Sequence, residues 1–392
     1  MKSKLSSLES LRGVAALIVV IDHSVNMFAP HIRWTNIEGM LGNVRRVVAW
    51  TPLSIFYSGI PAVWIFFMLS GFVLSIKFLK SPNDLAPIIG GASKRYLRLV
   101  VPIIGAAIAF CAMAFVGCQA GSLRLCEFPF ARVMIEAVWV APFTHHKLIN
   151  TPLWTISWEL FGSLLIFGML IVHFFIRNII ISVLLATIAV YILFNSNYSL
   201  FIIGLIICHL YFGGGILGIY NSDSYLKRLA LILLFASALF LMAYPYPRDN
   251  VQISAFHSIL YSSGEWYLDS TYYTKIGAIM FFIGFMVSPM AQRIIDNSVT
   301  RFLGYISFSM YILHYPIFFV VKNGFGISTL TLTQYVPFFA MVIVLLLVVS
   351  WIFAKYVDAF SIELSNRFGR WIVSVFPFER GALANSKQNE RV

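Results

Sequence analysis

The chain has 392 residues, of which 59% are hydrophobic and 11% are charged, and its mean hydropathy is +0.84. Soluble domains carry about 25% charged residues, so this composition excludes a soluble protein and predicts a polytopic membrane protein. The formal net charge is +12. Basic residues gather in the cytoplasmic loops of membrane proteins and attract anionic head groups. The charge therefore predicts contact with membrane lipids and requires no nucleic-acid partner.

Ten apolar segments are long enough, at about 20 residues each, to cross a bilayer as helices. They are 8–28, 53–77, 99–118, 152–175, 178–195, 199–219, 227–245, 274–290, 302–321 and 335–356. The sequence therefore predicts an all-α bundle of about ten transmembrane helices. The apolar segment 132–143 is too short to span, and we expect it to lie on the surface or to re-enter the membrane.

The distribution of basic residues orients this bundle. A cytoplasmic N-terminus places most of the 28 lysines and arginines on the inner side, as the positive-inside rule requires. Both termini are then expected in the cytoplasm. The first span contains Asp22 and His23 and is not followed by a small-residue cleavage site, so we expect it to be retained. The predicted organisation is one membrane domain, 1–373, and a polar tail, 374–392.

The four cysteines do not have the close Cys/His spacing of a zinc site, and no metal site is predicted. Cys118 and Cys126 fall at or just beyond the outer end of the third span. A disulfide there would close a short loop in an oxidising compartment. It depends on a Cα separation that the sequence does not give, so the bridged and free states both stay open.

The first span carries Arg12 and His23 eleven positions apart. On a helix this step places both side chains on one face, about 16 Å apart along the axis. A cation and an imidazole are costly in hydrocarbon unless they line a protein-enclosed or wet cavity. We therefore predict that both line a catalytic tunnel. The alternative is an interfacial arginine and a histidine that is hydrogen-bonded between helices.

Two further ionisable residues, Glu159 in the fourth span and His314 in the ninth, are predicted at a depth similar to that of His23. We expect the Glu159 carboxylate to hold the imidazole of His23 and to raise its basicity. Asp22 points about 100° away from His23 on the helix and is not expected to be its partner. The alternative is that these are unrelated buried polar residues.

Arg95 and Arg98 lie three positions apart, just before the predicted third span, and are neighbours on a helix. Paired guanidinium groups suit phosphate binding. Together with Arg12 they would form a cationic mouth at which a phosphorylated cofactor could dock. Taken alone, they would be lipid anchors at the inner face.

Five motifs in this order resemble the acyltransferase-3 family of integral membrane acyltransferases, which typically O-acetylate bacterial surface or exported glycans. They are LESLRGVAALIVVIDH, WIFFMLSGFVLS, RYLRLVVP, LWTISWELFGSLL and LGYISFSMYILHYPI. The family commonly has Tyr-x-x-Glu-x-Pro after its last span. Here KYVDAFS offers Tyr356 and Asp358 without the proline, which leaves the role of this corner open.

The resemblance implies a role for each residue in these motifs. His23 would be catalytic, Arg12, Arg95 and Arg98 would serve the acyl-CoA, and Glu159, His314, Trp154 and Tyr311 would belong to the site. Ser70 and Gly71 could stabilise an oxyanion, although helix packing is the favoured interpretation.

The function that follows is an O-acyltransferase of the bacterial inner membrane. It would move an acyl group, expected to be acetyl, from cytoplasmic acetyl-CoA to a hydroxyl of a glycan or lipid-linked sugar, with other polysaccharide-assembly proteins as candidate partners. His23 would act as a base or carry the acyl group. Two alternatives stay open: a non-catalytic scaffold, and a transporter or polysaccharide exporter with a buried His/Glu relay, whose unwound segment would be Gly213–Gly215.

Overall fold

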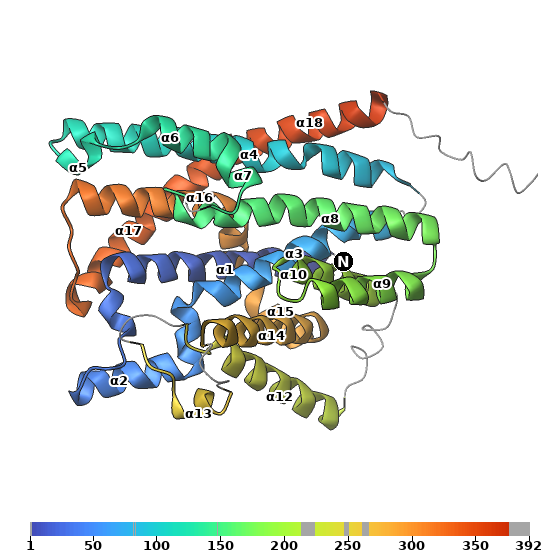
Figure 1. Ribbon diagram of the computed structural model, residues 1–392, viewed down its shortest axis with the longest axis horizontal. Coiled ribbons are helices and arrows are strands. Elements are labelled where there is room, and N and C mark those ends of the chain that lie inside the picture. The colour runs from blue at the N-terminus through green and yellow to red at the C-terminus, as the bar shows by residue number, and fades with distance from the viewer. Residues whose placement is uncertain are drawn as a thin grey trace, which may run out of the picture.

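The computed structural model describes residues 2–80, 82, 84–146, 148–212, 224–246, 251–260 and 266–375, and the regular elements within these ranges are all helices. Several long helices, among them α1 (Lys2–Phe28), α8 (Trp154–Ile176) and α16 (Ser298–Gly324), run roughly along the longest axis of the molecule (Figure 1). The predicted all-α bundle is therefore confirmed. Most of the predicted tail and the glycine run Gly213–Gly215 lie outside the described residues.

The bundle is built from eleven of the described helices. They are α1 (Lys2–Phe28), α3 (Gly59–Lys80), α4 (Ala86–Gln119), α8 (Trp154–Ile176), α9 (Ile179–Ile192), α10 (Tyr198–Phe212), α12 (Tyr225–Met242), α14 (Trp266–Val287), α16 (Ser298–Gly324), α17 (Leu332–Phe353) and α18 (Ala359–Val375). The connections contain shorter elements. These are η1 (Pro30–Arg33), α2 (Gly39–Trp50), η2 (Pro52–Tyr57), α5 (Leu123–Cys126), α6 (Phe130–Ile135), η3 (Glu136–Val140), α7 (Ala141–Phe143), η4 (Thr151–Leu153), α13 (Ala255–Ser258), α15 (Pro289–Ile295) and η5 (Ala354–Asp358).

Eight helical stretches in the described ranges are long and apolar enough to cross a membrane. The other two predicted spans correspond to α9 and α10, apolar helices with 14 and 15 described residues. The second span also begins later than predicted, because residues 52–57 form the separate 3₁₀ helix η2 and α3 starts at Gly59. The segment 132–143 forms α6, η3 and α7, which pack against α4.

Two glycines allow α1 and α16 to pack in very close contact. A Cβ atom on Gly13 would lie 2.3 Å from the backbone nitrogen of Gly304, and one on Gly304 would lie 2.4 Å from the carbonyl oxygen of Glu9. Small residues permit this approach between membrane helices. Asp296, next to the start of α16, accepts hydrogen bonds from Ser6 (2.7 Å) and Ser10 (3.3 Å) on α1. These contacts fix the register in which α1 and α16 present their histidines to each other.

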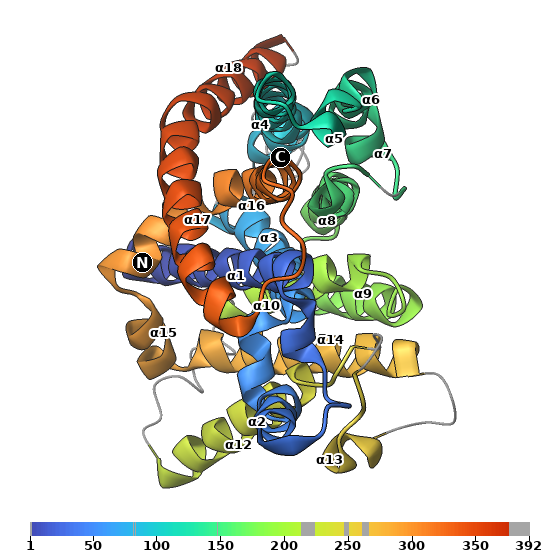
Figure 2. The same cartoon turned by 90° about the vertical axis from the view of Figure 1, so that its left-hand side faces the viewer.

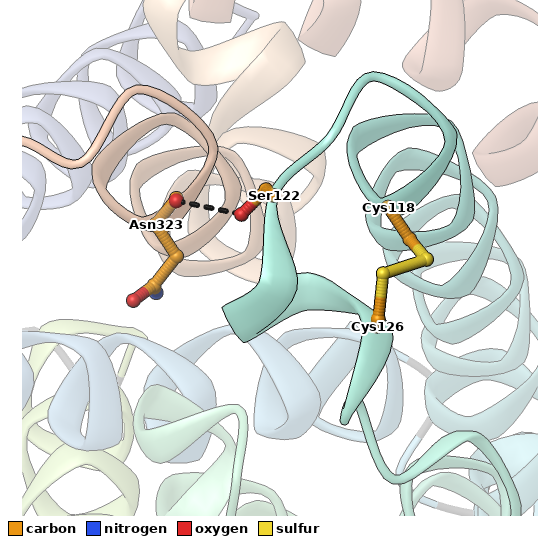
Figure 3. The surroundings of a disulfide bond; sticks show 4 residues. All are labelled: Cys118, Ser122, Cys126 and Asn323. Carbon is orange, nitrogen blue, oxygen red and sulfur yellow. Dashed lines mark hydrogen bonds between the residues drawn. A yellow bond between two sulfur atoms is a disulfide. The ribbon is translucent and has the colours of Figure 1, made fainter.

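A disulfide closes a short loop at the C-terminal end of α4, and a hydrogen bond joins this loop to α16. Cys118 and Cys126 form a disulfide, and the hydroxyl of Ser122 inside this loop donates a 2.9 Å hydrogen bond to the carbonyl of Asn323 (Figure 3). The open question about these cysteines is thus answered in favour of the bridge. The α5 end lies opposite the N-terminus along the long axis (Figure 1).

The last helices form a curved arm around α16 and α4 (Figure 2). The π-helical segment η5 joins α17 to α18 without a break. Pro102 in α4 lacks an N–H, so it leaves the carbonyl of Arg98 without its helical donor. The hydroxyl of Ser361 on α18 lies 3.4 Å from that carbonyl and donates to it. The arm therefore reaches the part of α4 that carries the predicted phosphate-binding arginines.

We predict that Gly304→Ala destabilises the protein by about 1–3 kcal/mol, the usual cost of overpacking, because the added methyl group meets the backbone of α1. Gly168→Ala in α8 is the matched control, since a Cβ atom there has nothing within 4 Å. The measurement is the apparent melting temperature of the purified protein in detergent. Equal melting temperatures for the two variants would contradict the close α1–α16 contact.

Candidate active site

A cavity of about 270 Å³ lies between α1, α3, α4, α8 and α16. One part of its wall is apolar and includes Val63, Phe66 and Ile156. Its polar wall consists of Glu9, Arg12, Ser70, Arg95, Arg98, Thr155, Glu159, Ser307 and Tyr311. Six residues predicted for the site therefore share one cavity, although they come from five helices that are far apart in the sequence.

Glu159 anchors one side of this cavity. Its carboxylate forms an ion pair with Arg95 and accepts a 2.7 Å hydrogen bond from the hydroxyl of Ser70. The Arg95 Nε also donates to the Ser163 hydroxyl at 2.9 Å. The Arg95 and Glu159 side chains are only 16% and 18% exposed. The pair therefore joins α4 to α8 in a region where water screens charge weakly.

This contact corrects the prediction that Glu159 holds His23. The rotation of α8 directs the carboxylate toward Arg95 on α4, one turn away from the Thr155 position that faces Tyr311. Ser70 is also shown to be more than a small helix-packing residue, because its hydroxyl is part of the polar cavity wall. Its neighbour Gly71 has the packing role, since a Cβ atom there would lie 1.9 Å from the carbonyl oxygen of Phe201.

Arg98 has a carboxylate partner as well. Its two terminal nitrogens lie 2.5 and 3.3 Å from the two carboxylate oxygens of Asp358 in η5. This pairing gives the Tyr356/Asp358 corner a structural role that the sequence left open. Both arginines were predicted just before the third span, whereas α4 begins at Ala86 and includes them in its 34 residues.

Arg12 differs from the other two arginines. It is exposed, and it lines the cavity. Among the described residues, no carboxylate forms an ion pair with it, whereas Arg95 and Arg98 each have one. A guanidinium that already has a bidentate partner has less capacity to bind a new anion. Arg12 is therefore the cation in this wall that is best placed to meet a phosphate group.

His23 and His314 form a hydrogen-bonded pair between α1 and α16. His23 Nδ1 lies 3.0 Å from His314 Nε2, and their rings stack with centroids 5.0 Å apart. His314 is fully buried. The sequence predicted that Glu159 would hold the His23 ring, but in the structure His314 forms this hydrogen bond. His314 lies on α16, which packs against α1 through the glycine contact described above.

The hydrogen bonds also assign the tautomers of this pair. His314 Nδ1 lies 3.2 Å from the carbonyl of Met310, which can only accept, so Nδ1 carries a proton and donates it. In a neutral ring Nε2 then has the lone pair and accepts from the Nδ1–H of His23. The lone pair of a neutral His23 is consequently on Nε2. This nitrogen is the one with the chemistry of a base.

A proline determines the local path of α16 next to His314. Pro316 has no N–H, which leaves the carbonyl of Ile312 without its helical donor. The side-chain amide of Asn150 supplies the hydrogen bond instead, at 3.2 Å. Asn150 precedes η4 and α8, so the same contact places the start of α8 beside the histidine turn of α16. Sequence analysis did not identify Asn150, although a proline in a predicted span indicates that such a partner is required.

Asp22, which precedes His23 on α1, faces Arg33 rather than the histidine pair. Asp22 forms an ion pair with Arg33 of η1 at 2.7 Å, and the Arg33 guanidinium lies 4.6 Å from the centre of the Tyr57 ring. The prediction that Asp22 points away from His23 fits this contact. It attaches the loop after α1 to the helix beside the histidine pair.

Neither histidine is among the described residues that line the cavity, and Trp154 is not among them either. The structure therefore separates the predicted site into two parts. One is the arginine-lined cavity, and the other is the histidine pair. Tyr311 lies between them, since it lines the cavity and its ring centre is 5.9 Å from that of His314.

The ion pair predicts which substitutions are coupled. Glu159→Gln leaves Arg95 without its carboxylate, and the loss of one partner of a buried pair costs about 3–5 kcal/mol. Adding Arg95→Met should recover much of that loss, because replacing both partners by neutral groups is often tolerated. The measurement is a double-mutant cycle on the apparent melting temperature. A cycle in which Glu159→Gln is coupled to a His23 substitution and not to Arg95→Met would contradict the ion pair and support the predicted Glu159–His23 contact.

Comparison with known proteins supports the family that the five sequence motifs indicated. No curated protein and no solved structure matches the chain significantly. Residues 5–355 match the profile of a family described as an acyltransferase domain. The match includes all five charged residues of the cavity wall and both histidines, and it ends before Asp358. The chain therefore belongs to the acyltransferase-3 family and is an integral membrane acyltransferase.

Proposed function

We propose that the protein transfers an acyl group, acetyl in the first instance, from cytoplasmic acyl-CoA to a hydroxyl of a cell-surface or exported glycan. The observation that carries this proposal is the His23–His314 hydrogen bond, because it directs a basic nitrogen of His23 away from its partner. Such a nitrogen suits the removal of a proton from a hydroxyl group. The family assignment supplies the acyl-transfer class.

The spacing of Arg12 and His23 matches the shape of the donor. Eleven residues of α1 separate their Cα atoms by about 16 Å. The pantetheine arm of CoA has about 12 bonds between its diphosphate and its sulfur, and three chain bonds extend about 3.3–3.6 Å, so the arm reaches about 13–14 Å. A diphosphate at Arg12 would therefore bring the thioester close to His23, with Arg95 and Arg98 held nearby by their carboxylates.

Two routes conserve atoms and charge. In direct transfer, His23 Nε2 takes the proton of the acceptor hydroxyl, the oxygen attacks the thioester carbonyl, the C–S bond breaks, and the thiolate receives the proton. In the stepwise route Nε2 attacks the thioester carbonyl, the C–S bond breaks and CoA leaves as the thiolate. The acceptor oxygen then attacks the acyl carbon, the acyl–Nε2 bond breaks, and the acceptor's proton neutralises the thiolate. His314 supports both, because it holds Nδ1 of His23 and fixes the orientation of the ring.

The acceptor is proposed to be a glycan or a lipid-linked sugar that approaches from the side opposite to the N-terminus. His23 lies near the end of α1 that is remote from the N-terminus, and the disulfide at that end of the bundle suits an oxidising compartment. The bacterial inner membrane provides this arrangement, with both termini of the chain in the cytoplasm. Other polysaccharide-assembly proteins would deliver the acceptor.

We predict that His23→Ala lowers transfer by about 10²–10⁴-fold, the usual loss for a general base, without changing the yield of folded protein. The assay uses purified protein, radiolabelled acetyl-CoA and a crude glycan acceptor. His145→Ala is the control, because this exposed histidine stacks on Trp158, away from the histidine pair. Turnover above half of the wild-type value in His23→Ala would overturn the proposed role.

A second prediction concerns the donor. Arg12→Ala should raise the apparent KM for acyl-CoA more than the apparent KM for the acceptor, since Arg12 is proposed to meet the donor's phosphates. Arg12→Lys should recover part of the loss, because the charge remains while the planar fork is lost. Arg367→Ala, on the exposed surface of α18, is the control. An unchanged donor KM in Arg12→Ala would remove Arg12 from donor binding.

A further inference from the structure

Two aromatic rings of the cavity wall contact each other, and one of them lies next to the histidine pair. Phe66 on α3 and Tyr311 on α16 meet edge to face, with centroids 6.1 Å apart, and both line the cavity. The His314 ring lies 5.9 Å beyond Tyr311, and the His23 ring lies 5.0 Å beyond His314. A chain of ring contacts therefore connects the cavity wall, through Tyr311, to the histidine pair.

Tyr311 is held firmly in this position. Its hydroxyl donates a 2.8 Å hydrogen bond to the carbonyl of Pro152 and accepts one, also at 2.8 Å, from the hydroxyl of Thr155. Both partners belong to the turn that starts α8. The Tyr311 side chain is almost fully buried, whereas Phe66 is partly exposed toward the cavity. Phe66 is therefore the ring with room to move, and Tyr311 is the fixed ring against which it closes.

The proposed donor has to pass the cavity wall. With its phosphates at Arg12, the pantetheine arm would have to leave the cavity to reach His23, because neither histidine is among the described residues that line it. Tyr311, in contact with Phe66, is the part of the cavity wall that lies next to His314. The cavity is polar on one side and can hold water, and water that reaches His23 could replace the acceptor hydroxyl. Closed sites commonly exclude water for this reason.

We infer that Phe66 and Tyr311 form a septum that keeps water from the histidine pair until the donor's arm displaces Phe66, and that the septum sets the ratio of acyl transfer to hydrolysis. This inference rests on the proposed function. The side reaction that it suppresses is acyl-CoA hydrolysis. There His23 takes a proton from water, the water oxygen bonds to the acyl carbon, the C–S bond breaks, and the thiolate receives the proton to give free acid and CoA.

The septum is tested by measuring two products in one reaction. Purified full-length protein is incubated with acetyl-CoA labelled in the acetyl group and with the glycan acceptor, and labelled acetate is compared with labelled glycan. Phe66→Ala should raise the acetate-to-glycan ratio several-fold, because alanine leaves a gap that the arm does not fill. Tyr311→Phe keeps the ring but loses both hydrogen bonds, so it should raise the ratio by less.

Phe72→Ala is the matched control. Phe72 lies on the same helix and is buried, but it packs against Tyr211 and Phe282 rather than the septum. It should lower stability and leave the ratio unchanged. Phe66→Leu, which keeps more of the packing, replaces Phe66→Ala if the alanine variant does not fold.

The outcomes separate the two proposals. A wild-type protein that neither transfers nor hydrolyses the acetyl group would overturn the proposed function itself. Normal transfer in wild type with an unchanged ratio in the Phe66 and Tyr311 variants would overturn the septum alone. A rise in the ratio in Phe72→Ala equal to that in Phe66→Ala would also overturn it, because the effect would then follow from general loosening of the helix.

Discussion

The ion pair between Arg95 and Glu159 joins α4 to α8 inside an apolar bundle, and the geometry of the cavity depends on it. A charge in such surroundings is tolerated only with a partner. Arg98 meets the same requirement through Asp358, which brings the curved arm of α17 and α18 against α4. Two carboxylates thereby hold two cations at the cavity wall in fixed positions. Arg12 lines the same wall, and among the described residues no carboxylate forms an ion pair with it.

A second constraint comes from prolines inside long helices. Each proline frees a carbonyl one turn earlier, and a buried carbonyl needs a donor. In α16 the donor is Asn150, and in α4 it is Ser361. In both cases the replacement donor comes from an element distant in sequence, so a local defect in one helix becomes a specific contact with another. These contacts place the start of α8 beside His314 and the arm beside Arg98.

Features that depend on one helix at a time could be predicted from the sequence. The class of fold, the ten apolar segments and the common face of Arg12 and His23 follow from composition and helical spacing. The partner of His23 does not, because it depends on how α8 and α16 rotate about their own axes. Equal depth favoured Glu159, yet a rotation of about one residue, roughly 100°, decides whether a carboxylate meets His23 or Arg95. The start of α4 was misplaced for another reason. Lys94, Arg95 and Arg98 lower the hydropathy of this part of α4, and in the structure Arg95 and Arg98 are paired with carboxylates of other elements.

The separation of the cavity from the histidine pair gives the two ends of α1 different roles. The part near Arg12 borders a polar cavity, and the part near His23 contacts the rings of His314 and Tyr315. An acyl group is chemically safe from water only while it is in an enclosed part of this path. A bundle that binds a charged donor on one side and a hydroxyl acceptor on the other must therefore keep a barrier between them. Rings attached to two different helices can supply that barrier and still be moved by a ligand.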